Sequence, residues 1–280
     1  MSVRVAAAAT LPHADRADLW TEAFSDYFAP SVFTAESLVA FEKAFDVDLE
    51  GSRVTFEENR PVAFAMLGMR GARGWLGGMG VIPAARRRGH GERLLRAVID
   101  AAKERGLATL RLEVLVQNTP AIPLYEAQGF RTLRKLEVWD RAADAAPRAL
   151  PNEPAQAITI DEAAARLGAE RIARAPWQRE LAAARVAFPD LRALASADGR
   201  AIAIFRTTTE RAGILELAAA PGTSPADRER GLDAVLGTIF QASMPARLVN
   251  LPEADEAAGA LARADLVVNH RQWEMELLLT

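Results

Sequence analysis

The residues from Val81 to Gly91 carry the most recognisable chemistry in this sequence, a glycine-containing loop with three consecutive arginines at positions 86–88. Glycine has no Cβ, so a ligand can approach the backbone closely at Gly89 and Gly91. The start of a helix offers unpaired N–H groups and the positive end of the helix dipole, and the arginines add positive charge. This combination predicts a binding site for a pyrophosphate.

Two elements must position this loop. The apolar, glycine-rich run from Trp75 to Val81 predicts a strand that ends at the loop. After the loop, apolar residues recur at helical spacing between Leu94 and Ala102, which predicts an amphipathic helix over Glu92 to Arg105. The loop is therefore expected to lie between the end of a strand and the first turn of a helix.

A second block of polar and glycine residues follows an apolar strand predicted at Leu110 to Val116: Asn118, Ala121, Leu124, Tyr125, Gly129 and Phe130. Together the two blocks resemble the motifs of the GNAT superfamily of N-acetyltransferases. The first is similar to Val-x-Pro followed by Arg/Gln-x-x-Gly-x-Gly/Ala, and the second to Asn-x-x-Ala-x-x-Leu-Tyr followed by Gly-Phe. The resemblance covers residues 75–140 and implies transfer of the acetyl group of acetyl-CoA to a primary amine.

The resemblance also implies where acetyl-CoA binds. Main-chain groups at the end of the first strand would bind the pantetheine amides in the manner of an added strand, and the Asn118 amide would contact the pantetheine arm. A turn or N-cap role for Asn118 is an alternative that can coexist with this contact. His90, at the variable position between the glycines, is expected to face solvent or the adenosine phosphate. The expected cofactor-binding residues are Met79, Gly80, Val81, Arg86, Arg87, Arg88, Gly89, His90, Gly91, Glu92, Asn118 and Tyr125.

Acetyl transfer to an amine needs a neutral nucleophile and a proton for the departing thiolate. A lysine-like amine with a pKa of about 10.4 is almost entirely protonated near neutral pH, so a base or a water chain helps. The thiolate has a pKa of about 8.5, so a positioned proton donor helps to complete the step. The resemblance assigns the donor role to Tyr125, one of two tyrosines in the chain. The alternative is a tyrosine that only packs in the core.

Glu113 is the candidate general base. It lies in an otherwise apolar strand, where period-two alternation places it on the same face as Arg111. The order Leu-Glu-Val, then Asn118 and Tyr125, looks like the bacterial ribosomal-protein alanine N-acetyltransferases, in which this glutamate is the base. The alternative is an Arg111–Glu113 or cross-strand ion pair, which would make Glu113 structural, or a water chain in place of a base.

Composition excludes several classes of protein. The chain has 280 residues, half of them hydrophobic, a net charge of −3, three scattered histidines and no cysteine. The charge balance gives no reason to expect a nucleic-acid partner, and no stretch approaches the roughly 20 apolar residues of a membrane span. No metal site is expected, and without cysteine no thiol acyl-enzyme can form, so direct transfer in a ternary complex is expected. We expect a cytoplasmic monomer or homodimer.

The second half of the chain is a weak internal repeat of the first. Arg60 to Ala65 has an echo at Arg200 to Phe205, and each is followed by a strand, a helix, a further strand, a short helix and a last strand. Where the first half has its arginines and glycines, the second has Asp227 and Glu229, whose carboxylates would repel a pyrophosphate. We therefore expect an α/β fold of two GNAT-like domains, each a twisted mixed sheet flanked by helices. The expected boundaries are 1–143 for the catalytic domain, 144–156 for an Ala/Pro-rich linker, and 157–280 for a degenerate GNAT-like domain.

The sequence indicates less about the acceptor substrate than about the cofactor site. The resemblance places the acceptor groove near the N-terminal helices, around Tyr27, Phe28 and Phe33, and a small-molecule amine is expected. One alternative is an N-terminal or lysine residue of a protein, which the spacing around Glu113 favours. A second alternative is a non-catalytic sensor that binds acetyl-CoA, although a sensor has little need for a proton donor such as Tyr125.

Overall fold

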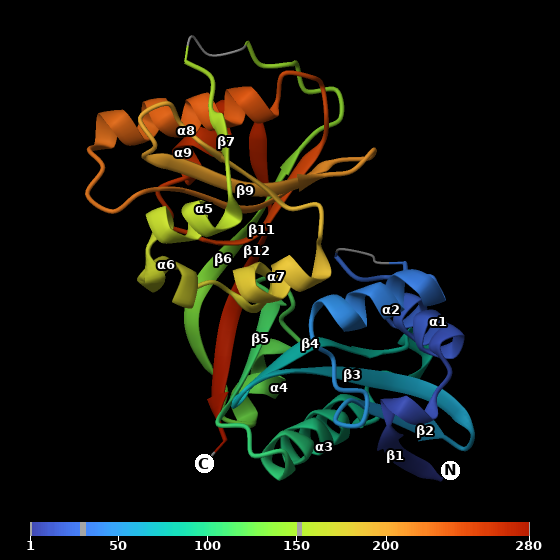
Figure 1. The fold of residues 1–280 in the computed structure, drawn as a ribbon. Coiled ribbons are helices and arrows are strands. Elements are labelled where there is room, and N and C mark those ends of the chain that lie inside the picture. The colour runs from blue at the N-terminus through green and yellow to red at the C-terminus, as the bar shows by residue number, and fades with distance from the viewer. Residues whose placement is uncertain (1, 29–31, 150–152, 280) are drawn as a thin grey trace. The chain divides into compact units, whose positions relative to one another are not determined.

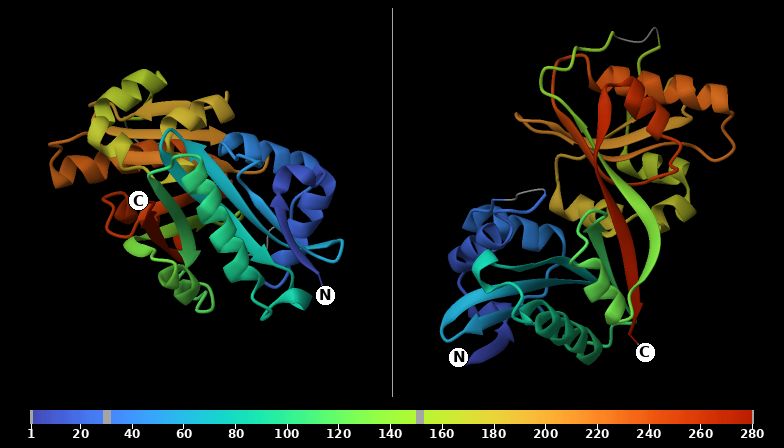
Figure 2. Two further views of the ribbon diagram at one scale, coloured as in Figure 1. Left: turned by 90° about the horizontal axis from the view of Figure 1, so that it is seen from below. Right: turned by 180° about the vertical axis from the view of Figure 1, so that it is seen from behind.

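The computed structural model describes residues 2–28, 32–149 and 153–279 (Figure 1). The chain forms two compact units. The first consists of Met1–Leu133 and Trp273–Thr280, and the second of Arg134–Gln272. Each unit contains a sheet with helices packed against it, as expected for an α/β fold (Figure 2).

The strands of the first unit are, in their order across the sheet, β1 (Val3–Ala7), β2 (Arg53–Glu57), β3 (Arg60–Arg70), β4 (Arg73–Val81), β5 (Thr109–Leu115) and the end of β12 (Leu266–Leu278). Its helices are α1 (His13–Ala23), α2 (Ala35–Ala44), α3 (His90–Glu104) and α4 (Ile122–Ala127). Strands β1 to β4 are antiparallel neighbours, whereas β4 and β5 are parallel. The strands and helix expected on either side of the arginine loop are confirmed.

Strand β3 shows why helices cover both faces of this sheet. Successive side chains of a strand point to opposite faces. From Val62 to Leu67 all side chains are buried, and the odd-numbered ones share a core with α3, while the even-numbered ones share a core with α1 and α2. The apolar stripe of α3, from Leu94 to Ala102, therefore packs on one face of the sheet and the aromatic side chains of α1 and α2 on the other.

The glycines of β4 make room for two tryptophan rings. A Cβ on Gly77 would lie 2.2 Å from the ring of Trp75, and a Cβ on Gly78 would lie 2.4 Å from the ring of Trp20. Real Cβ contacts are much longer, so any other residue would displace these rings. The glycine-rich composition of β4 thus has a packing cause in addition to any role in binding a ligand.

The second unit repeats this arrangement. Its strands, in order across the sheet, are β12, β6 (Arg131–Arg141), β11 (Ala246–Pro252), β10 (Ala212–Ala219), β9 (Ala201–Thr207), β8 (Arg192–Ala195) and β7 (Gln156–Ile158). Its helices are α5 (Ile160–Leu167), α6 (Ala169–Ala173), α7 (Leu181–Ala187), α8 (Pro225–Ile239) and α9 (Ala258–Arg263), with a 3₁₀ turn at Trp177–Arg179.

A backbone detail supports the repeat. Helix α4 is followed by Gly129 with φ +94, and α9 is followed by Asp265 with φ +62, so a left-handed residue ends both helices. Glycine adopts this conformation without strain, and aspartate tolerates it better than most residues. The short helix before the last strand therefore ends with the same backbone conformation in both units.

The boundaries between the two units differ from the domain boundaries at 143 and 157 that were expected from the sequence. The division falls inside β6 and again inside β12. The reason is pairing: β6 hydrogen-bonds to β11 of the second unit, while the end of β12 lies beside β5, with Glu276 bound to Arg111. Of the expected linker, residues 144–149 and 153–155 form neither helix nor strand, and residues 150–152 lie outside the described residues.

Candidate active site

The arginine loop leaves β4 through a 3₁₀ turn at Pro83–Ala85 and enters α3 at His90. Gly89 is the N-cap residue of α3, with φ +80, and apart from its neighbours in the chain no heavy atom lies within 4 Å of the position where a Cβ would be. The first N–H groups of a helix have no partner inside the helix. The open space above Gly89 therefore faces main-chain donors, as binding of a pyrophosphate requires.

The three arginines of the loop differ in what they bind. Arg86 donates to the main-chain oxygens of Val81 and Ala23 and forms a two-pronged ion pair with Asp26, at 2.6 and 2.7 Å. It therefore ties the loop to the end of α1. Its hydrogen bonds to the carboxylate lower the pKa of Asp26 below the usual value, against the opposing effect of burial.

Arg88 and His90 both bind Glu57 on β2. Glu57 accepts from Arg88 at 3.1 Å, and His90 Nε2 lies 2.8 Å from its other oxygen. The bond with His90 is the main cause that lowers the pKa of Glu57. His90 is only 3% exposed, so the expectation that its side chain faces solvent is wrong, whereas a position near the adenosine phosphate stays a prediction. Its ring is buried because a carboxylate on the adjacent strand binds it.

Arg87 has a positive φ of +62, and among the described residues no ion-pair partner is found for it. Of the three arginines, Arg87 is consequently the one whose positive charge could bind a negatively charged ligand. The sequence showed three positive charges, and the structure balances two of them with Asp26 and Glu57.

Strands β4 and β5 pair over a short stretch only: Arg73 to Trp75 of β4 pair with residues 109–111 of β5. Beyond Trp75, Met79, Gly80 and Val81 pair with β3 on one side, and the register with β5 does not continue to them. A sheet edge with unpaired main-chain groups can accept an added extended segment. The expected pantetheine site thus coincides with such an edge.

The two tyrosines of the chain lie together at the end of β5. The hydroxyl of Tyr27 accepts a hydrogen bond of 3.2 Å from the Asn118 side chain. Tyr125, on α4, is buried and packs edge-on against Phe130. Burial, and secondarily the Tyr27 phenol, raise the pKa of Tyr125 above that of a free tyrosine. Tyr125 is therefore a neutral phenol, and so a proton donor, at neutral pH.

Glu113 lies on β5, half-buried, and accepts a hydrogen bond of 2.7 Å from the indole Nε1 of Trp75. The alternative of an Arg111–Glu113 ion pair is wrong, because Arg111 pairs with Glu276 at 2.6 Å. Trp75 was not recognised as a site residue from the sequence, since an apolar strand gives a tryptophan a sufficient packing role.

The three expected acceptor residues have different surroundings. Tyr27 contacts Asn118, and its ring packs edge-on against Phe28, which is 54% exposed. The ring of Phe33 packs edge-on against Trp20 and Phe41, in the core beneath α1 and α2. Tyr27 therefore lies at the candidate site through its contact with Asn118, with Phe28 against its ring, whereas Phe33 packs in the core of α1 and α2.

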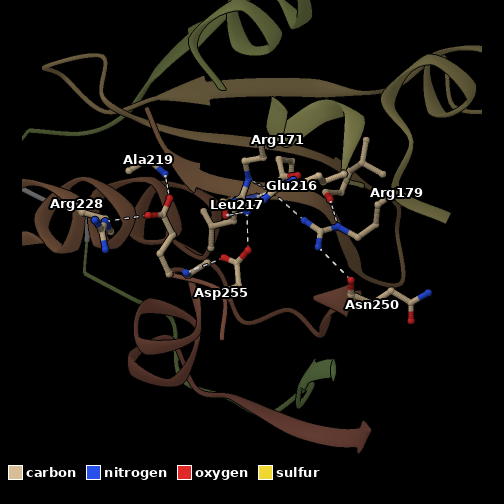
Figure 3. Close-up of polar contacts among 12 residues, drawn as sticks. Arg171, Arg179, Glu216, Leu217, Ala219, Arg228, Asn250 and Asp255 are labelled. Carbon is tan, nitrogen blue, oxygen red and sulfur yellow. Dashed lines mark hydrogen bonds and ion pairs between the residues drawn. The ribbon is translucent and has the colours of Figure 1, made fainter. Parts of the chain in front are cut away.

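The second unit has the same strand arrangement, but side chains of this unit occupy the space between its parallel strands β10 and β11. Strands β10 and β11 are in register for three residue pairs, as β4 and β5 are. Beyond these pairs the Arg179 guanidinium donates to Leu215 O on β10 at 2.7 Å and to Asn250 O on β11 at 3.3 Å. Figure 3 shows this guanidinium also directed at Glu216, at 2.9 Å.

Glu216 is the centre of this buried network. Arg171 binds it at 2.8 Å and joins it to Asp255 at 2.9 Å (Figure 3). Burial alone would raise the pKa of Glu216, but the charges of Arg179 and Arg171 outweigh burial and lower it. Paired and hydrogen-bonded in this way, the buried charges can remain ionised.

The main chain of β10 is likewise occupied. The N–H of Leu217 donates to Glu216 at 3.0 Å, and the N–H of Ala219 donates to Glu256 at 3.0 Å. Amide groups that would bind a pantetheine arm in the first unit have side-chain partners here. The two units therefore share a fold and differ in what fills the space between the parallel strands.

Comparison with known proteins agrees with the loop and the strand pair. The model of the acetyltransferase (GNAT) family matches residues 16–130. The chain contains a GNAT acetyltransferase domain. The ribosomal protein bS18-alanine N-acetyltransferase of Escherichia coli K12 is 44% identical over 75 residues, which are 25% of this chain and 51% of that protein. The homologous enzyme of Salmonella typhimurium is 40% identical over 80 residues. The chain thus spans about half the length of the curated relatives it matches.

Solved structures show that the likeness in fold extends over both units. A GCN5-related N-acetyltransferase from Sphaerobacter thermophilus has a TM-score of 0.75 at 19% identity, over 99% of this chain and 96% of that one. A tandem GNAT protein from the clavulanic acid biosynthesis pathway has a TM-score of 0.68 at 16% identity, over 100% and 99% of the two chains. The expected fold of two GNAT domains is confirmed.

Two further observations concern the described residues only. Among them, no group of three or more His, Cys, Asp or Glu side chains is arranged to hold a metal ion. In the same part of the chain, no helix combines the length and apolar character needed to cross a membrane.

Proposed function

We propose that this protein transfers the acetyl group of acetyl-CoA to a primary amine, and that the reaction takes place in its first unit. The observation that carries the proposal is the position of Tyr125, which is buried on α4 and packs in the same core as Met79 and Val81 of β4 and Val114 of β5. The loop that could hold a pyrophosphate follows β4 directly. A fold alone does not specify a reaction, so the proposal is argued from the residues of the site.

The first unit has the parts that acetyl-CoA needs. The N–H groups at the start of α3, the open space above Gly89 and the charge of Arg87 suit the pyrophosphate. On the side of β4 that faces β5, the pairing stops before Met79 to Val81, which leaves main-chain groups of Met79 for the pantetheine amides, while Val81 O accepts from Arg86. Asn118 lies at the end of β5 with its amide directed at Tyr27, where it could contact the arm.

The chemistry requires the nitrogen to lose two protons and the sulfur to gain one. In the proposed reaction Glu113 takes a proton from the acceptor ammonium, whose neutral nitrogen then forms a bond to the acetyl carbon and loses its second proton to water, and water also restores the proton of Tyr125. The bond between that carbon and the sulfur of CoA breaks, and Tyr125 gives its proton to the departing sulfur. One positioned acid or base typically contributes about 10²–10⁴-fold to a rate. With no cysteine in the chain, a direct transfer accounts for the reaction without a thiol intermediate.

The acceptor in this proposal is a small amine that binds near Tyr27 and Phe28. A protein N-terminus is the second candidate, because the chain is 44% identical over 75 residues to an enzyme named for acetylating an alanine of ribosomal protein bS18. A competition experiment separates the two. Small amines, polyamines, aminoglycosides and peptides with N-terminal alanine are mixed at equal concentration, and mass spectrometry identifies the acetylated species. Acetylated small amines support the first candidate, and acetylated peptides alone support the second.

Replacing Asp26 by asparagine is expected to tighten the binding of acetyl-CoA by up to about fivefold. The Asp26 carboxylate holds the Arg86 guanidinium and adds negative charge beside the loop, and exposed ion pairs of this kind contribute about 0–1 kcal/mol. Calorimetry at two salt concentrations measures the change, which should shrink as salt rises. Glu22→Gln, which breaks the exposed pair with Arg60, is the matched control. Weaker binding by Asp26→Asn would show instead that Asp26 orients Arg86 for the cofactor.

Acetyl-CoA is expected to bind at one site per chain. The loop that precedes α8 in the second unit, residues 221–224, contains no arginine, since Asp227 and Glu229 lie within α8 itself. Arg179 and Glu216 fill the space between the parallel strands of this unit. Calorimetric titration of the whole chain measures the stoichiometry. Two sites of comparable affinity would contradict this assignment of the second unit.

A further inference from the structure

Trp75 connects strand β4 to the candidate base. Its indole Nε1 donates to Glu113 Oε2 at 2.7 Å. Trp75 faces Arg111 at the last paired position of β4 and β5, so this bond spans the two strands where their register ends. Trp75 is 1% exposed, which keeps water from competing for its N–H group. A hydrogen bond to a charged group is stronger than one between neutral groups, and more so away from water.

The indole ring of Trp75 is held on both sides. Its centroid lies 5.6 Å from that of Phe45 and 6.2 Å from that of Phe41, both at α2. On the other side the ring lies so close to Gly77 that a Cβ there would be 2.2 Å from Cζ3. These neighbours fix the rotamer of Trp75 and with it the direction of the N–H group.

We propose that Trp75 is a positioning residue for acetyl transfer, which sets the orientation of the Glu113 carboxylate toward the acceptor amine. This inference rests on the proposed function. A carboxylate has about four lone-pair positions on two oxygens. The indole N–H occupies one of them and restrains the plane of the group. Losing that bond removes a restraint on the rotamer of Glu113, so its oxygens would spend less time within the reach of about 2.6–3.2 Å that proton transfer needs.

A double-mutant cycle tests this role. Trp75→Phe keeps a ring between α2 and Gly77 and removes the N–H group. It should lower kcat for the best acceptor about tenfold, the kind of loss that slight misplacement of a reacting group produces. The KM for acetyl-CoA should stay the same. In the background of Glu113→Gln, where no carboxylate remains to be positioned, Trp75→Phe should change kcat by less than about twofold.

Two further variants separate positioning from packing. A benzothienyl-alanine introduced at position 75 keeps the shape of the indole but has sulfur in place of the N–H group, and it should reproduce the effect of Trp75→Phe. Trp139→Phe is the matched control, because Trp139 donates the same kind of bond to Glu137, at 3.1 Å, in the second unit. It should lower the melting temperature without lowering kcat.

The outcomes are distinct. Equal losses from Trp75→Phe in the wild-type and Glu113→Gln backgrounds would show a packing role and overturn the inference. So would full activity of the benzothienyl protein, while acetyl transfer itself would stand in both cases. If the wild-type protein acetylates no amine, the proposed function fails, and the inference fails with it.

Discussion

Replacing Gly89 by valine is expected to abolish measurable binding of acetyl-CoA while the first unit stays folded. Gly89 is the N-cap of α3 and lies in the left-handed region, with nothing within 4 Å of a Cβ position. A branched Cβ would fill the space through which a pyrophosphate must approach the N–H groups. The left-handed conformation of a non-glycine residue costs roughly 1–2 kcal/mol, which is small beside a typical stability of about 5–15 kcal/mol.

The chain supplies a matched control for the backbone strain in this variant. Gly106, just after α3, has φ +71 and also has nothing within 4 Å of a Cβ position. Gly106→Val should lower the melting temperature by a similar amount and leave the affinity for acetyl-CoA as it is in the wild type. If Gly89→Val still binds acetyl-CoA as the wild type does, the phosphates lie elsewhere.

Replacing Tyr125 by phenylalanine is expected to lower turnover about 10²-fold with little change in the affinity for acetyl-CoA. The phenol acts on the departing thiolate, which does not exist in the bound ground state, so its loss should appear in the chemical step. The phenylalanine ring keeps the edge-on contact with Phe130, so stability should change little. Water can replace part of the lost proton donation, which is why some activity should remain.

The measurement must be made where chemistry limits the rate. Single-turnover experiments with saturating acetyl-CoA separate the chemical step from product release. Tyr27→Phe removes the other phenol, which is bound to Asn118, and its effect on the chemical step should be smaller than that of Tyr125→Phe. A turnover rate of Tyr125→Phe within about twofold of wild type would exclude Tyr125 as the acid, and a core-packing role would then explain its burial.

Local sequence signals were sufficient to predict the elements that carry the site. The glycine loop, the apolar run before it and the helical spacing after it depend on residues close in sequence, and the structure places β4, the loop and α3 accordingly. The unit boundaries were not predicted. Strand β12 lies beside β5 although their sequence positions are far apart, and no local pattern encodes which strand completes which sheet.

Within the site, residue types were easier to predict than partners. Tyr125 and Asn118 follow from a motif, whereas the bond of Asp26 to Arg86 and the burial of His90 against Glu57 depend on how α1, β2 and the loop come together. The pairs are separated by 60 and 33 positions in the chain. For Trp75 the sequence did contain a signal. A glycine two residues later on the same strand, Gly77, indicates that a large ring covers that position.

Release of CoA in the presence of an acceptor tests the central claim most directly. The chain has no cysteine, so a thiol reagent reports only the CoA that is set free. With acetyl-CoA and a panel of amines and peptides, the account predicts that thiol appears only when an acceptor is added, together with an equal amount of acetylated acceptor. Binding of acetyl-CoA by calorimetry, with no thiol release for any acceptor, would contradict the account and indicate a module that binds acetyl-CoA without acting on it.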